Sequence, residues 1–218
     1  MLWKNLKTLS VVAQKGGTGK TTLAVNLAVL AAMDGLRVAL IDCDPQRSAA
    51  GWWQIREADW PILIEQPAGQ LPSVIETLNA EGFNLAVVDT RPSVEAETLE
   101  AVQNSTAAII PTRPTSMDIS AVALTSQLVR SAQKPGCIVL NQCPPSIKQG
   151  EAPLTAETRA IANTLGLPVA PPALVNRIAY PYASNGGMAV REYEPGKAAD
   201  QEMTALWSHI KKGYLANG

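Results

Sequence analysis

The chain has little of several residue types on which common kinds of enzyme and binding protein depend. Its 218 residues include one histidine, His209, so a mechanism built on catalytic histidines has almost nothing to work with. Its three cysteines, Cys43, Cys137 and Cys143, are too few and too scattered for a disulfide framework or a zinc site, and a reducing cytoplasm is the default. No apolar run approaches the ~20 residues that span a bilayer. The first 17 residues show no cleavage-site pattern of a secretory signal.

There is also no large excess of charge of either sign. Lys and Arg number 18 and Asp and Glu 19, which gives a net charge of −1 and excludes a strongly basic protein that coats nucleic acid. A local basic patch is not excluded, because net charge says nothing about distribution. With 46% apolar and 17% charged residues, the chain has ample material for a folded core.

Short Val/Ile/Leu runs alternate with segments of helical length, which is typical of a parallel sheet covered on both faces. We predict strands at 8–13, 36–41, 84–88, 107–110 and 137–140. We predict helices at 19–34, 69–80, 94–103, 118–132, 156–165 and 197–212. The expected fold class is α/β, a doubly wound, mostly parallel sheet with helices on both faces. No linker or repeat divides the chain, so we expect one domain over residues 1–218.

The strongest motif is KGGTGKTT, residues 15–22, between the first predicted strand and the first predicted helix. Glycines there let successive backbone N–H groups point into one concavity, and the helix N-terminus adds partial positive charge, so the motif predicts a phosphate-binding loop. Lys20 would reach the β- and γ-phosphates, the Thr21 hydroxyl would ligate Mg²⁺, and Thr22 would bind the α-phosphate. The loop departs from the usual rule, because Gln14 replaces the first glycine and Lys15 adds a second lysine.

Carboxylates follow two further strands. Asp42 and Asp44 come directly after one strand, in DCDPQ, and Asp89 ends the run LAVV. Because the carboxyl ends of parallel strands converge on one crevice, Asp42 and Asp89 would hold Mg²⁺ and its waters beside the phosphates. A strand-terminal Asp alone is more often a turn or cap residue, but three strand ends here offer the required parts together.

These residues resemble the ParA/MinD family of deviant Walker-A ATPases, a group of P-loop NTPases. The resemblance rests on the loop 15–22, the DCDPQ segment 42–46 and Asp89, and continues more weakly in PTRP, residues 111–114, and in residues 177–192. No extension precedes the first strand, so the chain is most similar to the small ParF-like plasmid-partition ATPases.

The resemblance implies a mechanism. Two monomers would sandwich two ATP molecules, with Lys15 crossing to the partner's nucleotide, Lys20 and Thr21 acting within the subunit, and Asp44 orienting the attacking water. Hydrolysis would be slow and stimulated by a ParB-like or small centromere-binding adaptor. The ATP homodimer would bind nonspecific DNA on the nucleoid, in the cytoplasm.

Asn141, which follows the last predicted strand, matches an asparagine that family members place on the adenine. The alternative is that Asn141 is a turn residue. The expected nucleotide-binding residues are Gly16, Gly17, Thr18, Gly19, Lys20, Thr21, Thr22 and Asn141.

For several other residues the sequence allows more than one interpretation. Arg91, where the family usually has proline, is either a solvated loop arginine or a cation near the γ-phosphate or across the dimer. We interpret Cys43 as a small packing residue, because no histidine is near it in sequence. Tryptophans at 52, 53 and 60 are expected to pack a helix under the sheet or a dimer interface, and stacking on nucleic acid is the alternative. The basic residues considered for DNA binding are Lys134, Lys148, Arg159, Arg177, Arg191, Lys211 and Lys212.

The C-terminal segment carries an apolar stripe, Met203, Leu206, Trp207, Ile210 and Tyr214. A helix packing on the sheet explains it better than a membrane helix, which would need more basic residues on its polar face. Stable membrane association is therefore not expected. The leading hypothesis is a plasmid or chromosome partition ATPase. The alternatives are a positioning ATPase for a protein cargo, a MinD-like membrane regulator, a metabolic ligase similar to dethiobiotin synthetase, and a nucleotide-dependent binding module with vestigial hydrolysis.

Overall fold

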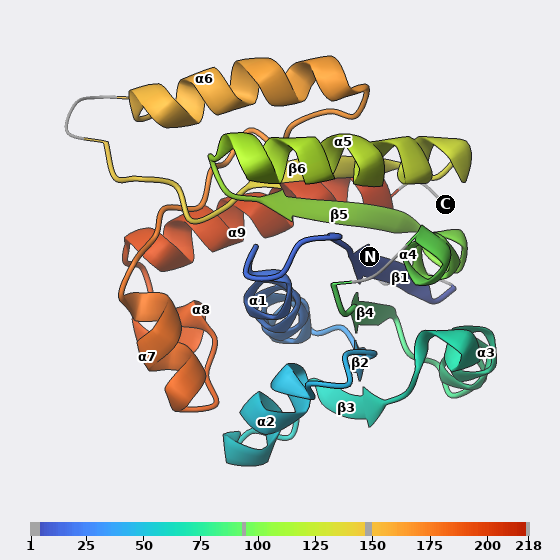
Figure 1. The fold of residues 1–218 in the computed structure, drawn as a ribbon. Helices are drawn as coiled ribbons and strands as arrows, with labels where there is room; N and C mark the ends of the chain where they lie inside the picture. Colours follow the sequence, from blue (N-terminus) through green and yellow to red (C-terminus); the bar gives the residue numbers. More distant parts are fainter. Residues whose placement is uncertain (1–4, 93–94, 147–149, 217–218) are drawn as a thin grey trace.

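Six parallel strands form one sheet in the computed structural model, which describes residues 5–92, 95–146 and 150–216 (Figure 1). The strand order is β3-β2-β4-β1-β5-β6, and every neighbouring pair is parallel. The strands are β1 (Lys7–Val11), β2 (Val38–Asp42), β3 (Ile62–Glu65), β4 (Leu85–Asp89), β5 (Ala107–Thr112) and β6 (Gly136–Leu140). The predicted parallel α/β sheet is confirmed.

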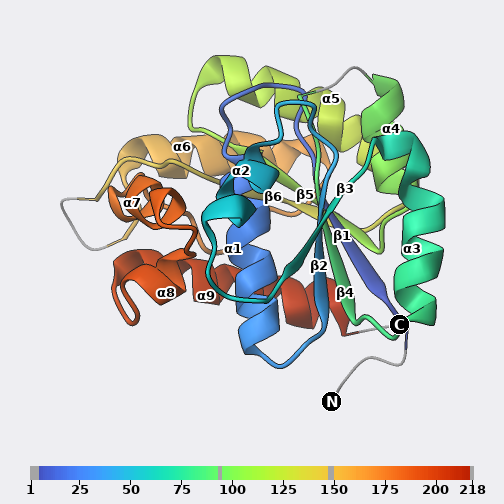
Figure 2. The same cartoon turned by 90° about the horizontal axis from the view of Figure 1, so that it is seen from below.

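Helices cover both faces of this sheet. They are α1 (Lys20–Met33), α2 (Ser48–Ile55), α3 (Leu71–Ala80), α4 (Glu95–Gln103), α5 (Ser116–Ser131), α6 (Pro153–Ala162), α7 (Ala179–Asn185), α8 (Val190–Tyr193) and α9 (Ala198–Ile210). Figure 2 shows α1 and α9 on one side of the sheet and α3 and α4 on the other. Helix α5 packs in the same layer as α3 and α4, which completes the doubly wound arrangement. None of the helices within the described ranges is long and apolar enough to cross a membrane.

The core lies in two layers, one on each side of the strands. Within β2, Leu40 belongs to the cluster that includes α1 and α9, and Ile41 to the cluster that includes α3, α4 and α5. Because successive strand side chains point to opposite faces and both faces are buried, the strands appear in the sequence as continuous apolar runs. The predicted C-terminal stripe packs in the first layer, where Met203, Leu206, Trp207 and Ile210 are all buried.

Four elements were missing from the sequence-based prediction, and some boundaries were wrong. The missing elements are α2, β3, α7 and α8. The edge strand β3 is four residues long, and α7 and α8 have seven and four residues, too short for a clear periodic pattern. Helix α5 begins two residues before the predicted start, because the Thr115 side chain caps it by accepting a hydrogen bond from the Asp118 backbone N–H. Helix α6 begins at Pro153 instead of Ala156, since proline is tolerated in a first turn. Val94, the first residue of the helix predicted over 94–103, lies outside the described residues.

The sheet reverses its winding at β1, which lies between β4 and β5. At such a switch point the loops after neighbouring strands diverge and leave a crevice at the carboxyl ends of the strands. The loops after β1, β2 and β4 are those that carry KGGTGKTT, DCDPQ and Asp89. The fold thus brings the three predicted motifs to one edge of the sheet.

Candidate functional site

The loop between β1 and α1 has the backbone of a phosphate cradle. Gly17 and Gly19 adopt φ angles of +75° and +87°, which side chains rarely allow. A Cβ on Gly19 would stand 2.3 Å from the Asn141 Nδ2, so no larger residue fits there without a shift. Helix α1 begins at Lys20, immediately after this turn, and its unpaired N-terminal N–H groups favour an anion.

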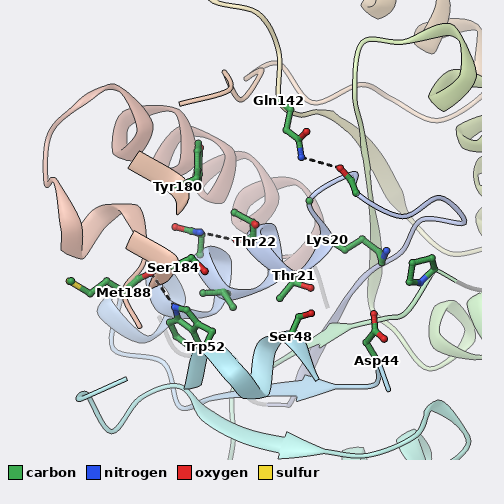
Figure 3. A pocket seen from close by; sticks show the side chains of 15 residues that line it. Lys20, Thr21, Thr22, Asp44, Ser48, Trp52, Gln142, Tyr180, Ser184 and Met188 are labelled. Carbon is green, nitrogen blue, oxygen red and sulfur yellow. Dashed lines mark hydrogen bonds between the residues drawn. The ribbon is translucent and has the colours of Figure 1, made fainter. Parts of the chain in front are cut away.

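Two side-chain amides that follow β6 hold the cradle by hydrogen bonds to its backbone. The Asn141 Nδ2 donates a hydrogen bond of 2.8 Å to the Thr18 carbonyl. The Gln142 Nε2 donates one of 3.1 Å to the Gly17 carbonyl, which Figure 3 shows as a dashed line. Asn141, predicted as an adenine ligand, thus contacts the loop itself and also lines the neighbouring cavity. Gln142 was not predicted; its only signal in the sequence is its place after a buried strand.

A cleft of about 440 Å³ opens beside the cradle. Figure 3 shows Lys20, Thr21 and Asp44 at one end of it, and Trp52, Tyr180 and Met188 at the other. A second cavity of about 400 Å³ shares a wall with it through Gly19, Thr22, Gln142, Tyr180 and Ser184. The cleft therefore runs from a charged end toward a more apolar one, as a nucleotide with a triphosphate requires.

Lys20 lies at the charged end and is almost completely buried. Burial lowers the pKa of its ammonium group, and the nearby carboxylates of Asp89 and Asp44 offset part of that shift. A buried cation facing two carboxylates is well placed to bind a phosphate group in the same space.

Asp89 is fully buried, and neither of its carboxylate oxygens has a hydrogen-bond partner among the described residues. Burial raises the pKa of Asp89 to about 7, the charges of Asp42 and Asp44 add to this rise, and the Thr21 side chain and Lys20 oppose it. Buried polar atoms without partners are rare and call for an explanation. A magnesium ion with its waters fits these oxygens, because Mg²⁺ is commonly held by one or two carboxylates and by phosphates. The Thr21 hydroxyl beside Asp89 completes the predicted donor set.

Replacing Asp89 with asparagine should stabilise the nucleotide-free protein at alkaline pH. The carboxyl group loses its proton near pH ~4 in the unfolded chain but only near 7 in the folded one. Stability therefore falls as pH rises between these values, and the variant escapes this loss. We expect a gain of roughly 1–3 kcal/mol at pH 8 that shrinks toward pH ~5, measured by urea unfolding.

Asp200→Asn is the matched control, because Asp200 is equally buried but accepts hydrogen bonds from Arg191 and from the Gly196 N–H. It should destabilise the protein at both pH values. If the free energy of unfolding depended on pH equally in the wild type and in Asp89→Asn, the raised pKa of Asp89 would be contradicted.

Asp42 shapes the loop that carries Asp44. Its Oδ1 accepts a hydrogen bond of 3.0 Å from the Asp44 N–H, and its Oδ2 one of 2.9 Å from the Ala50 N–H. Burial raises the pKa of Asp42, and these backbone hydrogen bonds partly oppose the rise. Asp44 lines the cleft, and its own Oδ1 accepts from the Gln46 N–H. The direct contacts of Asp42 are with the backbone of this loop, and its role at a metal stays a prediction.

Lys15 points away from its own phosphate cradle to α5. Its ammonium group forms an ion pair with Asp118, whose side chain is completely buried, while the Lys15 side chain stays 32% exposed. Asp118 also accepts a hydrogen bond of 2.6 Å from the Arg113 Nε. Asp118 was missed in the sequence, where an acidic residue in a first helical turn has an ordinary explanation as a partner of the helix dipole.

Other residues considered in the sequence have structural partners. Arg91 forms an ion pair with Glu97 of α4. Burial raises the pKa of the Cys43 thiol to about 12, which supports its interpretation as a packing residue. Trp52 is buried and donates a hydrogen bond to the Met188 carbonyl, whereas Trp53 and Trp60 are partly exposed.

The basic residues considered for DNA binding are largely paired. Four of them, Arg159, Arg177, Arg191 and Lys211, form ion pairs within the chain. Lys148 lies outside the described residues.

Comparison with known proteins agrees with this geometry. Residues 9–190 match the model of the CobQ/CobB/MinD/ParA nucleotide binding domain. A maintenance of carboxysome distribution protein A from Halothiobacillus neapolitanus is 30% identical over 217 residues, covering 93% of this chain and 95% of the relative. The chromosome-partitioning ATPase Soj of Thermus thermophilus is 28% identical over 167 residues, covering 62% of this chain and 67% of the relative.

Solved structures confirm the fold. The MinD protein of Pyrococcus horikoshii complexed with Mg-ADP has a TM-score of 0.78 at 18% identity, covering 97% of this chain and 98% of that chain. The apo McdA structure from Cyanothece has a TM-score of 0.79 at 16% identity, covering 94% and 99%. With its phosphate cradle, its strand-end carboxylates and a family model that matches most of its length, the chain belongs to the CobQ/CobB/MinD/ParA nucleotide-binding family and is an ATPase of the ParA/MinD type.

Proposed function

We propose that this ATPase is a dimerising switch that segregates or positions a cargo, and that residues 1–218 act as one ATPase domain. The observation that carries the proposal is the second lysine of the phosphate loop. Lys20 already fills the charged end of the subunit's own cleft, whereas Lys15 is directed out of it and keeps a third of its side chain exposed. A lysine in this position is available to a nucleotide held by a second copy of the chain.

Within one subunit, the cradle and α1 bind the triphosphate of ATP. The backbone N–H groups of residues 16–19 and the N-terminus of α1 orient the phosphates, Lys20 neutralises their charge, and Thr22 contacts the α-phosphate. The Thr21 hydroxyl and the Asp89 carboxylate would hold Mg²⁺, and Asp42 would contribute through water. When bound, the ion supplies further neutralisation of charge on the β- and γ-phosphates.

Asp44 orients the water that attacks the γ-phosphate. Its carboxylate lines the cleft on the side of Lys20, and the two backbone hydrogen bonds of Asp42 fix the loop that carries it. We expect this hydrolysis to be slow, as the resemblance to the family implies, which suits a timed switch that an adaptor accelerates.

The ATP dimer binds nonspecific DNA in the cytoplasm, on the nucleoid, and an adaptor of the ParB-like or small centromere-binding kind links it to a cargo. The carboxysome-distribution relative and the partition relatives both support positioning, so we keep a protein assembly beside a plasmid or chromosome locus as cargo. Because a dimer doubles any basic patch, modest patches of exposed lysine and arginine suffice for binding that depends on salt.

The mass of the protein in solution tests the switch. Sedimentation velocity should show a monomer without nucleotide and with ADP, and a dimer with ATP. A metabolic ligase of the same fold has no need of this change, so a monomer in all three states would contradict the proposal.

A further inference from the structure

Two cationic side chains meet at one buried carboxylate beside the phosphate loop. The Asp118 side chain is completely buried and contacts both the Lys15 ammonium and the Arg113 guanidinium. Arg113 uses two nitrogens, with Nε at 2.6 Å from Oδ2 and Nη2 at 3.3 Å from Oδ1. Burial alone would raise the pKa of Asp118, but hydrogen bonds from Arg113 and Lys15 hold it below its usual value, so the group is a carboxylate in the resting protein.

We propose that Asp118 is a positioning residue for Lys15, which it holds within its own subunit until the ATP dimer forms, and that Arg113 is the cation that remains on Asp118 afterwards. The inference rests on the proposed function, in which Lys15 moves to the partner's phosphates. Lys15 cannot reach a second subunit while it is paired with Asp118. On dimerisation it therefore leaves the Asp118 carboxylate and binds a phosphate of the partner's nucleotide. The ion pair therefore sets how much ATP the exchange requires.

Arg113 makes this exchange possible. A buried carboxylate left without a cation is strongly destabilising, because the charge loses both water and its partner. Arg113 donates to both carboxylate oxygens of Asp118 and comes from the loop after β5, so it need not move with Lys15. Its guanidinium also lies against the phosphate loop, with Nη1 3.7 Å from the position of a Cβ on Gly17.

The two residues thus have opposite expected effects, which a merely structural role would not produce. Asp118→Asn removes the charge that holds Lys15 and should lower the ATP concentration for half-maximal dimerisation by about fivefold or more. Arg113→Gln leaves Asp118 bare once Lys15 departs and should raise that concentration by about fivefold or more. In the double variant no buried carboxylate is left bare when Lys15 departs, so its ATP requirement should equal that of Asp118→Asn.

The experiment is a titration of ATP followed by sedimentation velocity for the wild type, both single variants and the double variant, with thermal melting to verify folding. Asp200→Asn is the matched control, since it removes a buried carboxylate that pairs with an arginine, Arg191, on other elements. Its ATP requirement should stay at the wild-type value.

Several results would overturn the inference. One is an ATP requirement of Asp118→Asn that equals or exceeds that of the wild type. Another is a shift of the ATP requirement in the same direction in both single variants. A third is a double variant whose ATP requirement stays as high as that of Arg113→Gln. A loss of ADP affinity in monomeric Arg113→Gln would make Arg113 a phosphate ligand and would also overturn it. A wild type that stays monomeric with ATP would instead refute the proposed function, and this inference with it.

Discussion

Lys15→Ala is expected to bind nucleotide normally and to remain monomeric with ATP. The phosphates within the subunit are bound by the cradle and by Lys20, which the substitution leaves in place. The closed dimer would lose a charge-assisted contact to the partner's nucleotide in each of its two symmetric sites. We expect dimer affinity to fall by at least about 100-fold, which corresponds to about 2.7 kcal/mol.

Sedimentation velocity with ATP measures this loss, and binding of a fluorescent ADP analogue verifies that the monomer is competent. Lys212→Ala removes an exposed lysine in the π-helical segment Lys211–Leu215 that follows α9 and serves as the control, with wild-type dimerisation expected. An ATP dimer of Lys15→Ala would mean that Lys15 does not act across the interface.

Asp44→Ala is expected to form the ATP dimer and to release phosphate at least about 100-fold more slowly, because it removes the carboxylate that orients water without touching the cradle. Asp44 also accepts a hydrogen bond from the Gln46 N–H, so alanine alone could loosen the loop. Asp44→Asn keeps an acceptor at that position and separates the two effects. Both variants should lose turnover and keep dimerisation. Phosphate release at the wild-type rate would remove Asp44 from the mechanism.

The sequence was sufficient to predict the sheet and the phosphate loop, for physical reasons. A strand that is buried on both faces, such as β4, appears in the sequence as a continuous apolar run. Helix α1 begins at Lys20, directly after a turn whose positive φ angles at Gly17 and Gly19 favour glycine. The strand-end position of Asp89 followed from the parallel arrangement, since all such ends meet at one edge.

The elements that were missed depend on contacts between distant parts of the chain. The edge strand β3 is only partly buried and is defined by its pairing with β2, not by a strong pattern of its own. Likewise, Trp52 lines the cleft because Met188, more than 100 residues later, accepts its indole N–H. No local pattern indicates such a pairing.

The partner of Lys15 was missed for the same reason. In the sequence Asp118 is a first-turn acid of a helix, and only the packing of α5 beside the phosphate loop brings it to Lys15. Asn141 was noticed, but its hydrogen bond to Thr18 depends on how closely the loop approaches β6.

Binding of random-sequence duplex DNA tests the central claim most directly. The Asp44→Ala variant, which should hold the ATP state, is titrated against such DNA with ATP and with ADP at about 50 and about 200 mM salt. The proposed function predicts binding with ATP that falls at least about tenfold at the higher salt, and little binding with ADP. Absence of binding in both states, or equal binding in both, would contradict an ATP-gated switch that acts on DNA.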